Sequence, residues 1–326
     1  MTSAASIIDA PKVELIMPAS LGDIASGWRQ LWRAVPGASP FLAPAWLDAW
    51  AEVYAPGRTW AATLRDDGQL VALLPLFVWD KALLLAGTGP SDHGGALILP
   101  GYDRWAGALL EAAVDAVEDD FDRVDLQQLS PASPLANAEV PGWCPWTEAG
   151  NFCVTLSLDP QAMPKKMSDD WHYLVRRLQR EGGLIDVVGP QEIGCGIAEL
   201  ERLHRLRWRT RGQSGMLADP LLRDLVATAA PRLAADGLLR LYRLQLGGET
   251  IAVLLMLRGD DTACYYLSGF DPAYARFSPG TALIGSAIAD VAGEGAITFD
   301  FLRGGEAYKY RWGAEDRPLV RRVLTR

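Results

Sequence analysis

The order of secondary-structure elements expected in the second half of the chain limits its fold more than any other feature. Hydrophobic periodicity and turn residues predict a strand, two helices, three strands, a helix and a strand, at 184–188, 191–211, 220–235, 238–246, 249–258, 261–269, about 281–292 and 296–302. Gly247-Gly248 and Gly259-Asp260 provide tight turns, so the three central strands follow one another in antiparallel fashion. This order predicts a mixed α/β sheet with helices packed on it.

The first half of the chain repeats the same order more loosely. The corresponding strands and helices are expected at 12–16, 21–34, 44–54, 59–65, 70–79, 82–86, 95–99, 103–118 and 123–128. We therefore predict an internal duplication, with one lobe at 12–150 and another at 151–326, joined through a Pro- and Trp-containing linker at 131–150. A helix from Ser168 to Arg180, a short helix near 306–312 and a strand at 318–324 complete the second lobe.

Composition and charge remove several classes of protein. The 326 residues are 49% hydrophobic and 22% charged, and no apolar run approaches the ~20 residues of a membrane span. The four cysteines form no CxxC pair and have no histidine at metal-ligand spacing, so we expect reduced thiols in the cytoplasm and no metal. The net charge of −9 argues against general nucleic-acid binding.

Charge is distributed unevenly along the chain. Residues 1–150 hold 8 Lys and Arg against 19 Asp and Glu, whereas residues 151–326 hold 23 against 21. The second half can therefore accept an anionic small ligand, although two domains of different surface composition explain the difference equally well. P-loop, GxGxxG, HExxH and nucleophile-elbow motifs do not occur, which disfavours most kinases, dehydrogenases and hydrolases.

Several spaced motifs carry a family resemblance over about residues 165–312. They are Ser268-Gly269-Phe270-Asp271-Pro272-x-Tyr274, Phe277-Ser278-Pro279-Gly280, Asp300-Phe301-Leu302-Arg303-Gly304-Gly305 and Tyr308-Lys309-x-x-Trp312. Together with the element order, they resemble GNAT-superfamily acyltransferases, and in particular the CelD-like family named after bacterial cellulose biosynthesis. The tail also resembles, more distantly, the FemABX-type peptidoglycan aminoacyl transferases. The resemblance implies two GNAT-like lobes, of which the first is degenerate and the second carries the donor site.

The GNAT resemblance places the pyrophosphate of acetyl-CoA or another acyl-CoA at the start of the helix that follows the three strands. The residues at that position are Phe277, Ser278, Gly280 and Thr281. Free N–H groups and the helix dipole give a physical reason for an anion to bind at a helix start. The segment departs from the usual Gly-rich loop, and a structural turn with Pro near the first helical position explains it equally well.

Four residues are candidates for catalysis. By resemblance, Lys309 could hold the charge that develops on the reacting carbonyl oxygen, next to Tyr308. His204 could be a general base for an ammonium acceptor, because histidine ordinarily titrates near neutrality, and Asp300 could orient Tyr308 or Lys309. A structural lysine and a hydrogen-bonded structural histidine are the alternatives.

Five residues are candidates for binding the acceptor. His204, Arg207 and Arg211 share one helix face, so the two arginines could hold an acceptor phosphate beside Trp208, which could stack on a sugar ring. Asp92 and His93 lie in a Gly-flanked loop of the first half. Core packing for Trp208 and plain turn chemistry for Asp92 and His93 remain open.

The sequence thus predicts an N-acyltransferase that uses acetyl-CoA or another acyl-CoA and acts on an amino sugar or similar amine in exopolysaccharide or envelope metabolism. One alternative is a FemABX-like enzyme that uses aminoacyl-tRNA. Another is a non-catalytic GNAT-fold scaffold in a polysaccharide synthase complex, which the unusual pyrophosphate segment would favour.

Overall fold

The computed structural model describes residues 11–16, 22, 24–55, 58–117, 121–159 and 161–326. The chain divides into two compact units, residues 1–151 with 318–326, and residues 152–317. The starts and ends predicted at residues 21 and 118 lie outside the described residues. None of the helices in the described ranges has the length and apolar character that crossing a membrane requires.

The first unit is a mixed sheet with helices packed on it. Its strands follow the order β1-β2-β3-β4-β6-β13, with β5 beside β3. The pairs β1/β2, β2/β3 and β3/β4 are antiparallel, whereas β4/β6 is parallel. Its elements are β1 (Lys12–Ile16), α1 (Ala25–Ala34), α2 (Pro44–Tyr54), β2 (Thr59–Asp66), β3 (Gln69–Trp79), β4 (Ala82–Leu85), β5 (Leu97–Ile98), α3 (Ala106–Ala116) and β6 (Arg123–Leu129).

The second unit repeats this arrangement. Its strands follow the order β8-β9-β10-β11-β12-β7, antiparallel except for the parallel pair β11/β12. Its elements are β7 (Cys144–Ser157), α4 (Lys165–Arg180), β8 (Leu184–Val187), α5 (Ile193–Arg209), α6 (Pro220–Ala235), β9 (Leu239–Leu246), β10 (Glu249–Arg258), β11 (Thr262–Phe270), α7 (Pro279–Gly293), β12 (Thr298–Arg303), α8 (Ala307–Tyr310) and β13 (Glu315–Thr325).

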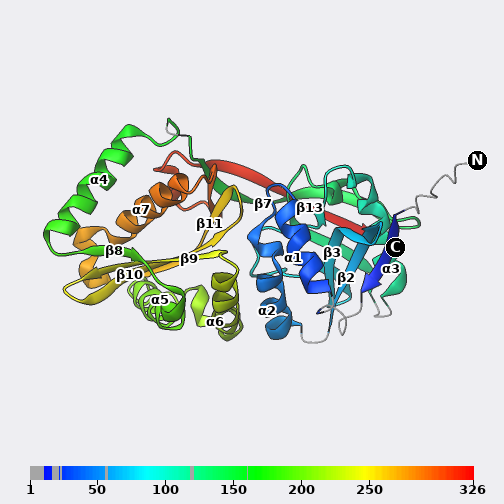
Figure 1. The fold of residues 1–326 in the computed structure, drawn as a ribbon, viewed down its shortest axis with the longest axis horizontal. Coiled ribbons are helices and arrows are strands. Elements are labelled where there is room, and N and C mark those ends of the chain that lie inside the picture. The colour runs from blue at the N-terminus through cyan, green and yellow to red at the C-terminus, as the bar shows by residue number, and fades with distance from the viewer. Residues whose placement is uncertain (1–10, 17–21, 23, 56–57, 118–120, 160) are drawn as a thin grey trace, which may run out of the picture. The chain divides into compact units, whose positions relative to one another are not determined.

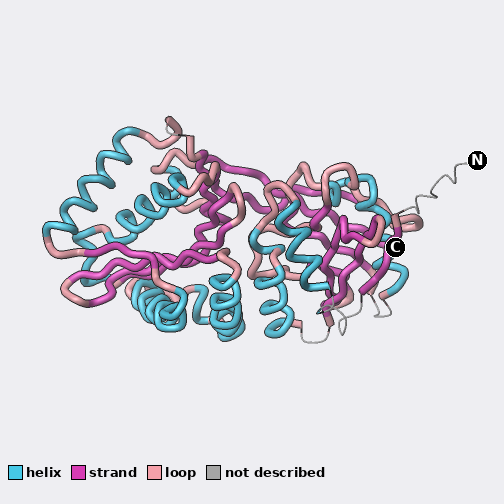
Figure 2. The backbone as a smooth tube through the Cα atoms, in the orientation of Figure 1, coloured by secondary structure: helices cyan, strands magenta, loops and turns pink. Residues whose placement is uncertain are grey.

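The helices of the second unit cover both faces of its sheet. Helices α5 and α6 lie on one face, and α4 and α7 lie on the other (Figures 1 and 2). Buried residues of α7 pack on the strands through an almost entirely apolar face, in a core that includes Leu283, Ala287, Leu254 and Phe299. The fold is therefore the mixed α/β architecture that the element order predicts, with the same strand order and directions in each unit.

Strands β7 and β13 differ from the prediction in where they start or in the unit to which they belong. Strand β7 begins at Cys144, inside the stretch expected to be a linker, and its Cys153–Ser157 end pairs with β12 of the second unit. Strand β13, assigned from sequence to the second lobe, pairs with β6 through Val320–Thr325, and residues 318–326 belong to the first unit. Each sheet is thus completed by the strand that follows the other repeat in sequence, a long-range exchange without a local signal.

Candidate functional site

A gap between two parallel strands sets the position of the candidate site in the second unit. Strands β11 and β12 pair only over Thr262–Cys264 and Thr298–Asp300. Beyond that pairing β11 continues to Phe270 and then leads through Asp271–Ser278 into α7. The start of α7 therefore lies at the end of β11 that has left its parallel neighbour.

A β-bulge decides which side chains of β11 face this gap. Leu255 of β10 pairs with Leu267, and the next residue, Met256, pairs with Tyr265, so Tyr266 is an extra residue in β11. Regular alternation would place Tyr265 and Ser268 on opposite faces. The bulge brings both onto one face, which is a common function of bulges beside binding sites.

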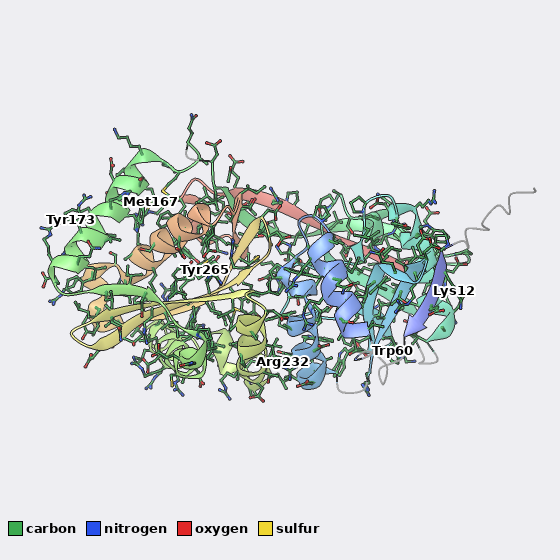
Figure 3. All side chains as sticks on the ribbon, viewed as in Figure 1. Lys12, Trp60, Met167, Tyr173, Arg232 and Tyr265 are labelled. Atoms are coloured by element: carbon green, nitrogen blue, oxygen red, sulfur yellow. The ribbon has the colours of Figure 1, made fainter. Side chains whose placement is uncertain are left out.

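A pocket of about 300 Å³ lies between the end of β11 and the start of α7. Its walls come from the end of α5, from β11, from the first turn of α7 and from α8, with Met167 of α4 at its edge; Figure 3 labels Met167 and Tyr265. Its lining residues are Met167, Arg207, Arg211, Tyr265, Ser268, Phe270, Ala275, Ser278, Pro279, Gly280, Thr281, Ile284, Tyr308, Arg311 and Trp312. The structure therefore brings together Ser278, Gly280, Thr281, Arg207, Arg211 and Tyr308, six of the residues predicted from sequence.

The pocket is suited to an anion. Arg207, Arg211 and Arg311 contribute to its lining, and none of the lining residues in the described part of the chain is acidic. Pro279 occupies the first position of α7 and has no N–H, but the N–H groups of Gly280 and Thr281 lie in the first turn, where an α-helix provides no partner. The positive end of the 15-residue α7 dipole adds to this field.

A hydrogen-bonded row of hydroxyl groups lines the same pocket. The Nη1 of Arg207 donates to Ser268 Oγ over 3.1 Å, and Ser268 hydrogen-bonds with the hydroxyl of Tyr265. Tyr308 lines the same pocket, and its burial, together with the neighbouring Tyr265, raises the pKa of its hydroxyl. Tyr308 therefore keeps its proton throughout the physiological pH range.

The structure gives Lys309 a different role from the one that the sequence predicted. Its side chain is buried, and Nζ donates to the carbonyl oxygens of Leu302, Arg303 and Gly304 at 3.2, 2.8 and 2.8 Å. Nζ also forms an ion pair of 2.9 Å with Glu306. All three ammonium protons are thus engaged by the loop before α8, and Lys309 does not line the pocket.

Asp300 acts on the same loop. Its Oδ1 accepts a 2.7 Å hydrogen bond from the backbone N–H of Leu302, a buried residue with a φ of 62°. A left-handed conformation is unfavourable for a branched side chain, so the loop needs contacts that fix it. Asp300 and Lys309 supply them and so position α8, which carries Tyr308.

The structure does not bring His204 to the pocket. The imidazole is 3% exposed and packs beside Trp208, and its Nδ1 has no hydrogen-bond partner within the described residues. Burial, reinforced by the nearby Arg207 guanidinium, lowers its pKa to about 4. A Cβ added at Gly269 would collide with the His204 backbone, so close packing of α5 on β11 explains its burial. The general-base assignment is replaced by a structural one.

The buried imidazole makes stability depend on pH. The unfolded chain protonates His204 below a pKa of about 6.5, whereas the folded protein resists protonation until about pH 4, so acid favours unfolding between these values. We expect the free energy of unfolding to fall by up to about 1.4 kcal/mol per pH unit from this group as the pH decreases from 6.5. Urea unfolding between pH 7 and pH 5 checks this.

His204→Gln should remove that part of the slope, and His172→Gln, at an exposed position of α4, is the matched control. Equal slopes for His204→Gln and the unmodified protein would show that His204 is protonated as readily in the folded chain as in the unfolded one.

The remaining predicted residues divide between the pocket and its surroundings. Arg207 lies 5.1 Å from the ring centre of Phe270, and Arg211 lies 5.5 Å from that of Trp208, so Trp208 supports the arginine side chains from outside the pocket lining. Phe277 is buried in the core and does not line the pocket. Its assignment to the donor site is therefore corrected, because its ring anchors the segment before α7 instead.

Asp92 and His93 belong to the first unit. They lie in the loop between β4 and β5, where Asp92 is buried and His93 is half-buried, with the His93 ring 6.1 Å from that of Phe41. Their role in binding an acceptor stays a prediction.

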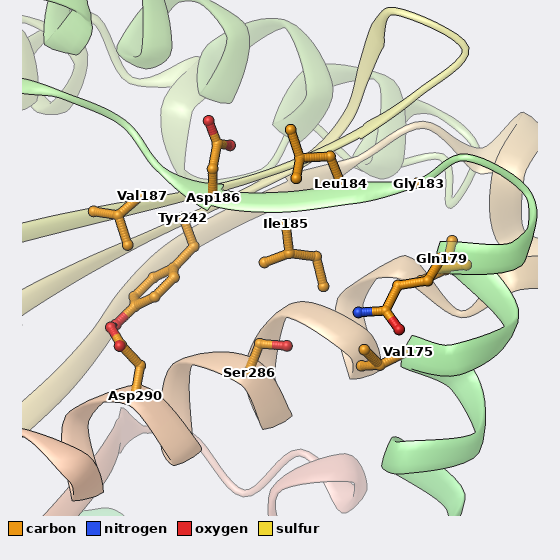
Figure 4. Close-up of a pocket in the computed structure, with 11 residues that line it drawn as sticks. Val175, Gln179, Gly183, Leu184, Ile185, Asp186, Val187, Tyr242, Ser286 and Asp290 are labelled. Atoms are coloured by element: carbon orange, nitrogen blue, oxygen red, sulfur yellow. The ribbon is translucent and has the colours of Figure 1, made fainter.

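A second pocket, of about 440 Å³, lies between α4, α7 and β8 of the same unit. Figure 4 shows Ile185 and Val187 projecting into it from β8, and Tyr242 directed at Asp290 of α7. The Tyr242 hydroxyl donates to Asp290 over 2.7 Å, and Asp186 is paired with Arg243 at 2.6 Å. None of the site residues predicted from sequence lines this pocket, and its acidic groups oppose an anionic ligand.

Sequence comparison identifies the kind of domain that the second unit contains. Residues 166–310, from α4 to α8, match the family model of an acetyltransferase (GNAT) domain. No curated protein sequence matches the chain. The GNAT part of the resemblance is thereby confirmed, and the second unit has a GNAT-type, acyltransferase-like fold.

Solved structures resemble the chain over almost its whole length. The crystal structure of FemX has a TM-score of 0.68 at 11% identity and covers 95% of this chain and 96% of that chain. The C-terminal domain of a putative lysylphosphatidylglycerol synthetase from Agrobacterium fabrum has a TM-score of 0.61 at 13% identity, with coverages of 93% and 92%. L-PGS from Bacillus licheniformis has a TM-score of 0.57 at 13% identity, with coverages of 87% and 91%. At these identities the similarity shows the fold.

Sequence reasoning missed three lining residues that matter for the chemistry. Arg311 occupies one of the unassigned positions of the Tyr308-Lys309-x-x-Trp312 motif, so its neighbourhood was recognised but its side chain was not assigned. Tyr265 and Ser268 lie in a strand of otherwise regular pattern, and only the bulge at Tyr266 places them together. That bulge depends on pairing with β10 and leaves no clear local signal.

Proposed function

We propose that this protein is an N-acyltransferase that transfers the acyl group of acetyl-CoA or another acyl-CoA to an amine. The donor binds in the pocket of about 300 Å³ at the start of α7. The single observation that carries the proposal is the position of this pocket: it joins the first turn of α7 to the part of β11 that extends beyond its pairing with β12, and three arginines line it. Those features suit a ligand that has phosphates at one end and a reactive acyl group at the other.

The reaction requires a hydrogen-bond donor more than a metal or a nucleophile. The amine nitrogen forms a bond to the thioester carbonyl carbon, the C–S bond breaks, the amine loses a proton and the leaving sulfur gains one. Tyr308 is buried, keeps its proton and lines the pocket, so we assign it as a hydrogen-bond donor to the leaving sulfur, which takes its proton from water. The lining residues in the described ranges include neither carboxylate nor imidazole. We therefore assign the loss of the amine proton to water.

The acceptor and its setting rest on the CelD-like resemblance. We propose an amino sugar or a similar amine of bacterial exopolysaccharide or envelope metabolism, acylated in the cytoplasm, with a polysaccharide synthase complex as the partner. Trp208 lies in the last turn of α5 and Arg211 just beyond it, in the pocket lining, and both would contact such an acceptor.

The donor site is tested by Gly280→Val and acetyl-CoA binding. A Cβ at Gly280 meets only Phe270, at 3.9 Å, so the chain should still fold, whereas the branched side chain extends into the pocket. We expect calorimetric titration to show at least tenfold weaker binding of acetyl-CoA, because the bulk separates the phosphates from the α7 N–H groups.

Gly194→Val is the matched control. Gly194 occupies the same second position of α5, is exposed, and has nothing within 4 Å of an added Cβ. Equal acetyl-CoA affinity for Gly280→Val and Gly194→Val, with both folded, would contradict the assignment of the donor site.

The similarity to FemX favours a second candidate, a transferase that takes its acyl group from aminoacyl-tRNA. The net charge of −9 disfavours it, because a large polyanion requires an extended basic surface. Titration of the unmodified protein with acetyl-CoA and with aminoacyl-tRNA separates the two donors. Binding of aminoacyl-tRNA alone would favour the FemABX-like reaction.

A further inference from the structure

Two arginines lie against one aromatic ring just before the start of α7. The guanidinium carbon of Arg177, on α4, is 5.1 Å from the ring centre of Phe277, and that of Arg276 is 4.8 Å from it. The Nη1 of Arg177 also donates to the backbone carbonyl oxygen of Arg276 over 3.2 Å. Phe277 is buried, so its ring and this hydrogen bond hold the half-buried Arg177 beside the segment that leads into α7.

The two charges have no acidic partner. Neither arginine forms an ion pair with a carboxylate in the part of the chain that the structure describes. Two carboxylates near this segment have other partners. Asp271 accepts from the backbone N–H of Ala273 over 2.9 Å, and Glu249 accepts from the Tyr274 hydroxyl over 3.0 Å. Neighbouring guanidinium groups without a counter-charge repel each other, so the pair is suited to an anion that the chain itself does not supply.

The position of the pair beside the pocket indicates which part of a donor would reach it. Ala275 and Ser278, one residue before and two residues after Arg276, line the pocket, whereas neither arginine of the pair does. A pocket of about 300 Å³ is at the lower end of the range for small-ligand sites, so a molecule as large as acetyl-CoA extends beyond it. With the thioester at Tyr308 and the pyrophosphate at the first turn of α7, the end that extends toward Arg276 is the nucleotide.

We propose that Arg177 and Arg276 bind the 3′-phosphate of the acyl-CoA donor and so select CoA over donors that lack this group. The inference rests on the proposed acyl transfer and deepens it, because it specifies the form of the donor. The 3′-phosphate is a monoester on the ribose, far from the thioester, and such a group carries about −1.5 to −2 charges at neutral pH. Guanidinium groups bind phosphate oxygens through paired N–H donors, and two arginines supply them to one dianion.

The test compares acetyl-CoA with acetyl-3′-dephospho-CoA, which has the same thioester and pyrophosphate. We expect calorimetric titration of the unmodified protein to show at least about tenfold tighter binding of acetyl-CoA. Arg177→Gln and Arg276→Gln should each reduce this ratio, and the double variant should bind the two donors with affinities within about twofold of each other. Its affinity for acetyl-3′-dephospho-CoA should match that of the unmodified protein, because the first turn of α7 still holds the pyrophosphate.

Arg180→Gln is the matched control. Arg180 is exposed on the same helix, and its Nε donates to the carbonyl oxygen of Arg176, so this substitution should leave the ratio unchanged. The ratio of two affinities measured on one variant does not respond to partial loss of the fold, because a smaller competent fraction weakens both donors equally. A purely structural role for the two arginines therefore cannot produce the expected result.

Equal affinity of the unmodified protein for the two donors would overturn the inference while leaving the proposed transfer intact. A double variant that keeps the ratio of the unmodified protein would also overturn it, because the arginines would then not distinguish the 3′-phosphate. Failure of the unmodified protein to bind either donor would overturn the proposed function, and the inference with it.

Discussion

Lys309→Met should lower the free energy of unfolding by about 3 kcal/mol, although it keeps most of the aliphatic side chain. The substitution removes the donor for three backbone carbonyl groups and leaves Glu306 without its partner. Buried acceptors left unsatisfied cost about 1–3 kcal/mol each. The partly buried carbonyl groups of Arg303 and Gly304 recover part of this through hydrogen bonds with water. Urea unfolding followed by tryptophan fluorescence measures the change.

Lys166→Met is the matched control, because Lys166 is exposed on α4 and should tolerate the change within about 0.5 kcal/mol. Similar stabilities for the two variants would show that the ammonium of Lys309 does not hold the loop. It would then be available for the catalytic role that the family resemblance implies.

Tyr308→Phe should have the largest effect on turnover. It removes the hydroxyl that we assign as hydrogen-bond donor to the leaving sulfur, and loss of a preorganised donor typically lowers kcat by about 10²–10³. Affinity for acetyl-CoA should change little, because the arginines and the start of α7 hold the phosphates. Steady-state thiol release together with calorimetric titration separates the two parameters.

Tyr310→Phe provides the control on the same short helix. Its hydroxyl donates to Asp316 over 2.7 Å at the surface, outside the pocket. If Tyr308→Phe and Tyr310→Phe had the same kcat as the unmodified protein, departure of the sulfur would not depend on the Tyr308 hydroxyl, and the assignment of Tyr308 would be wrong.

Local patterns were sufficient for most of the fold. The helix at 220–235 and the strand at 249–258 were predicted to the residue, because capping, hairpin turns and hydrophobic periodicity act within a few residues. The prediction assigned strand β13 to the wrong unit. Its partner β6 lies nearly 200 residues earlier, and nothing in the strand itself specifies that pairing.

The family motifs indicated where the pocket lies but not which of their side chains face it. Gly280, Thr281 and Tyr308 line the pocket, and their roles there stay predictions. Lys309 and His204 are polar residues in the same motifs, and the sequence favoured a role for both in the site. The folded chain buries both residues. Lys309 donates to carbonyl groups of the loop before α8, and His204 lies where α5 packs closely on β11.

The structure of the protein with acetyl-CoA bound would test the central claim most directly. We expect the pyrophosphate to accept hydrogen bonds from the N–H groups of Gly280 and Thr281 and from Arg207 or Arg311. The thioester should then lie within hydrogen-bond distance of the Tyr308 hydroxyl. Acetyl-CoA bound in the pocket between α4, α7 and β8, or bound with its thioester away from Tyr308, would contradict the account.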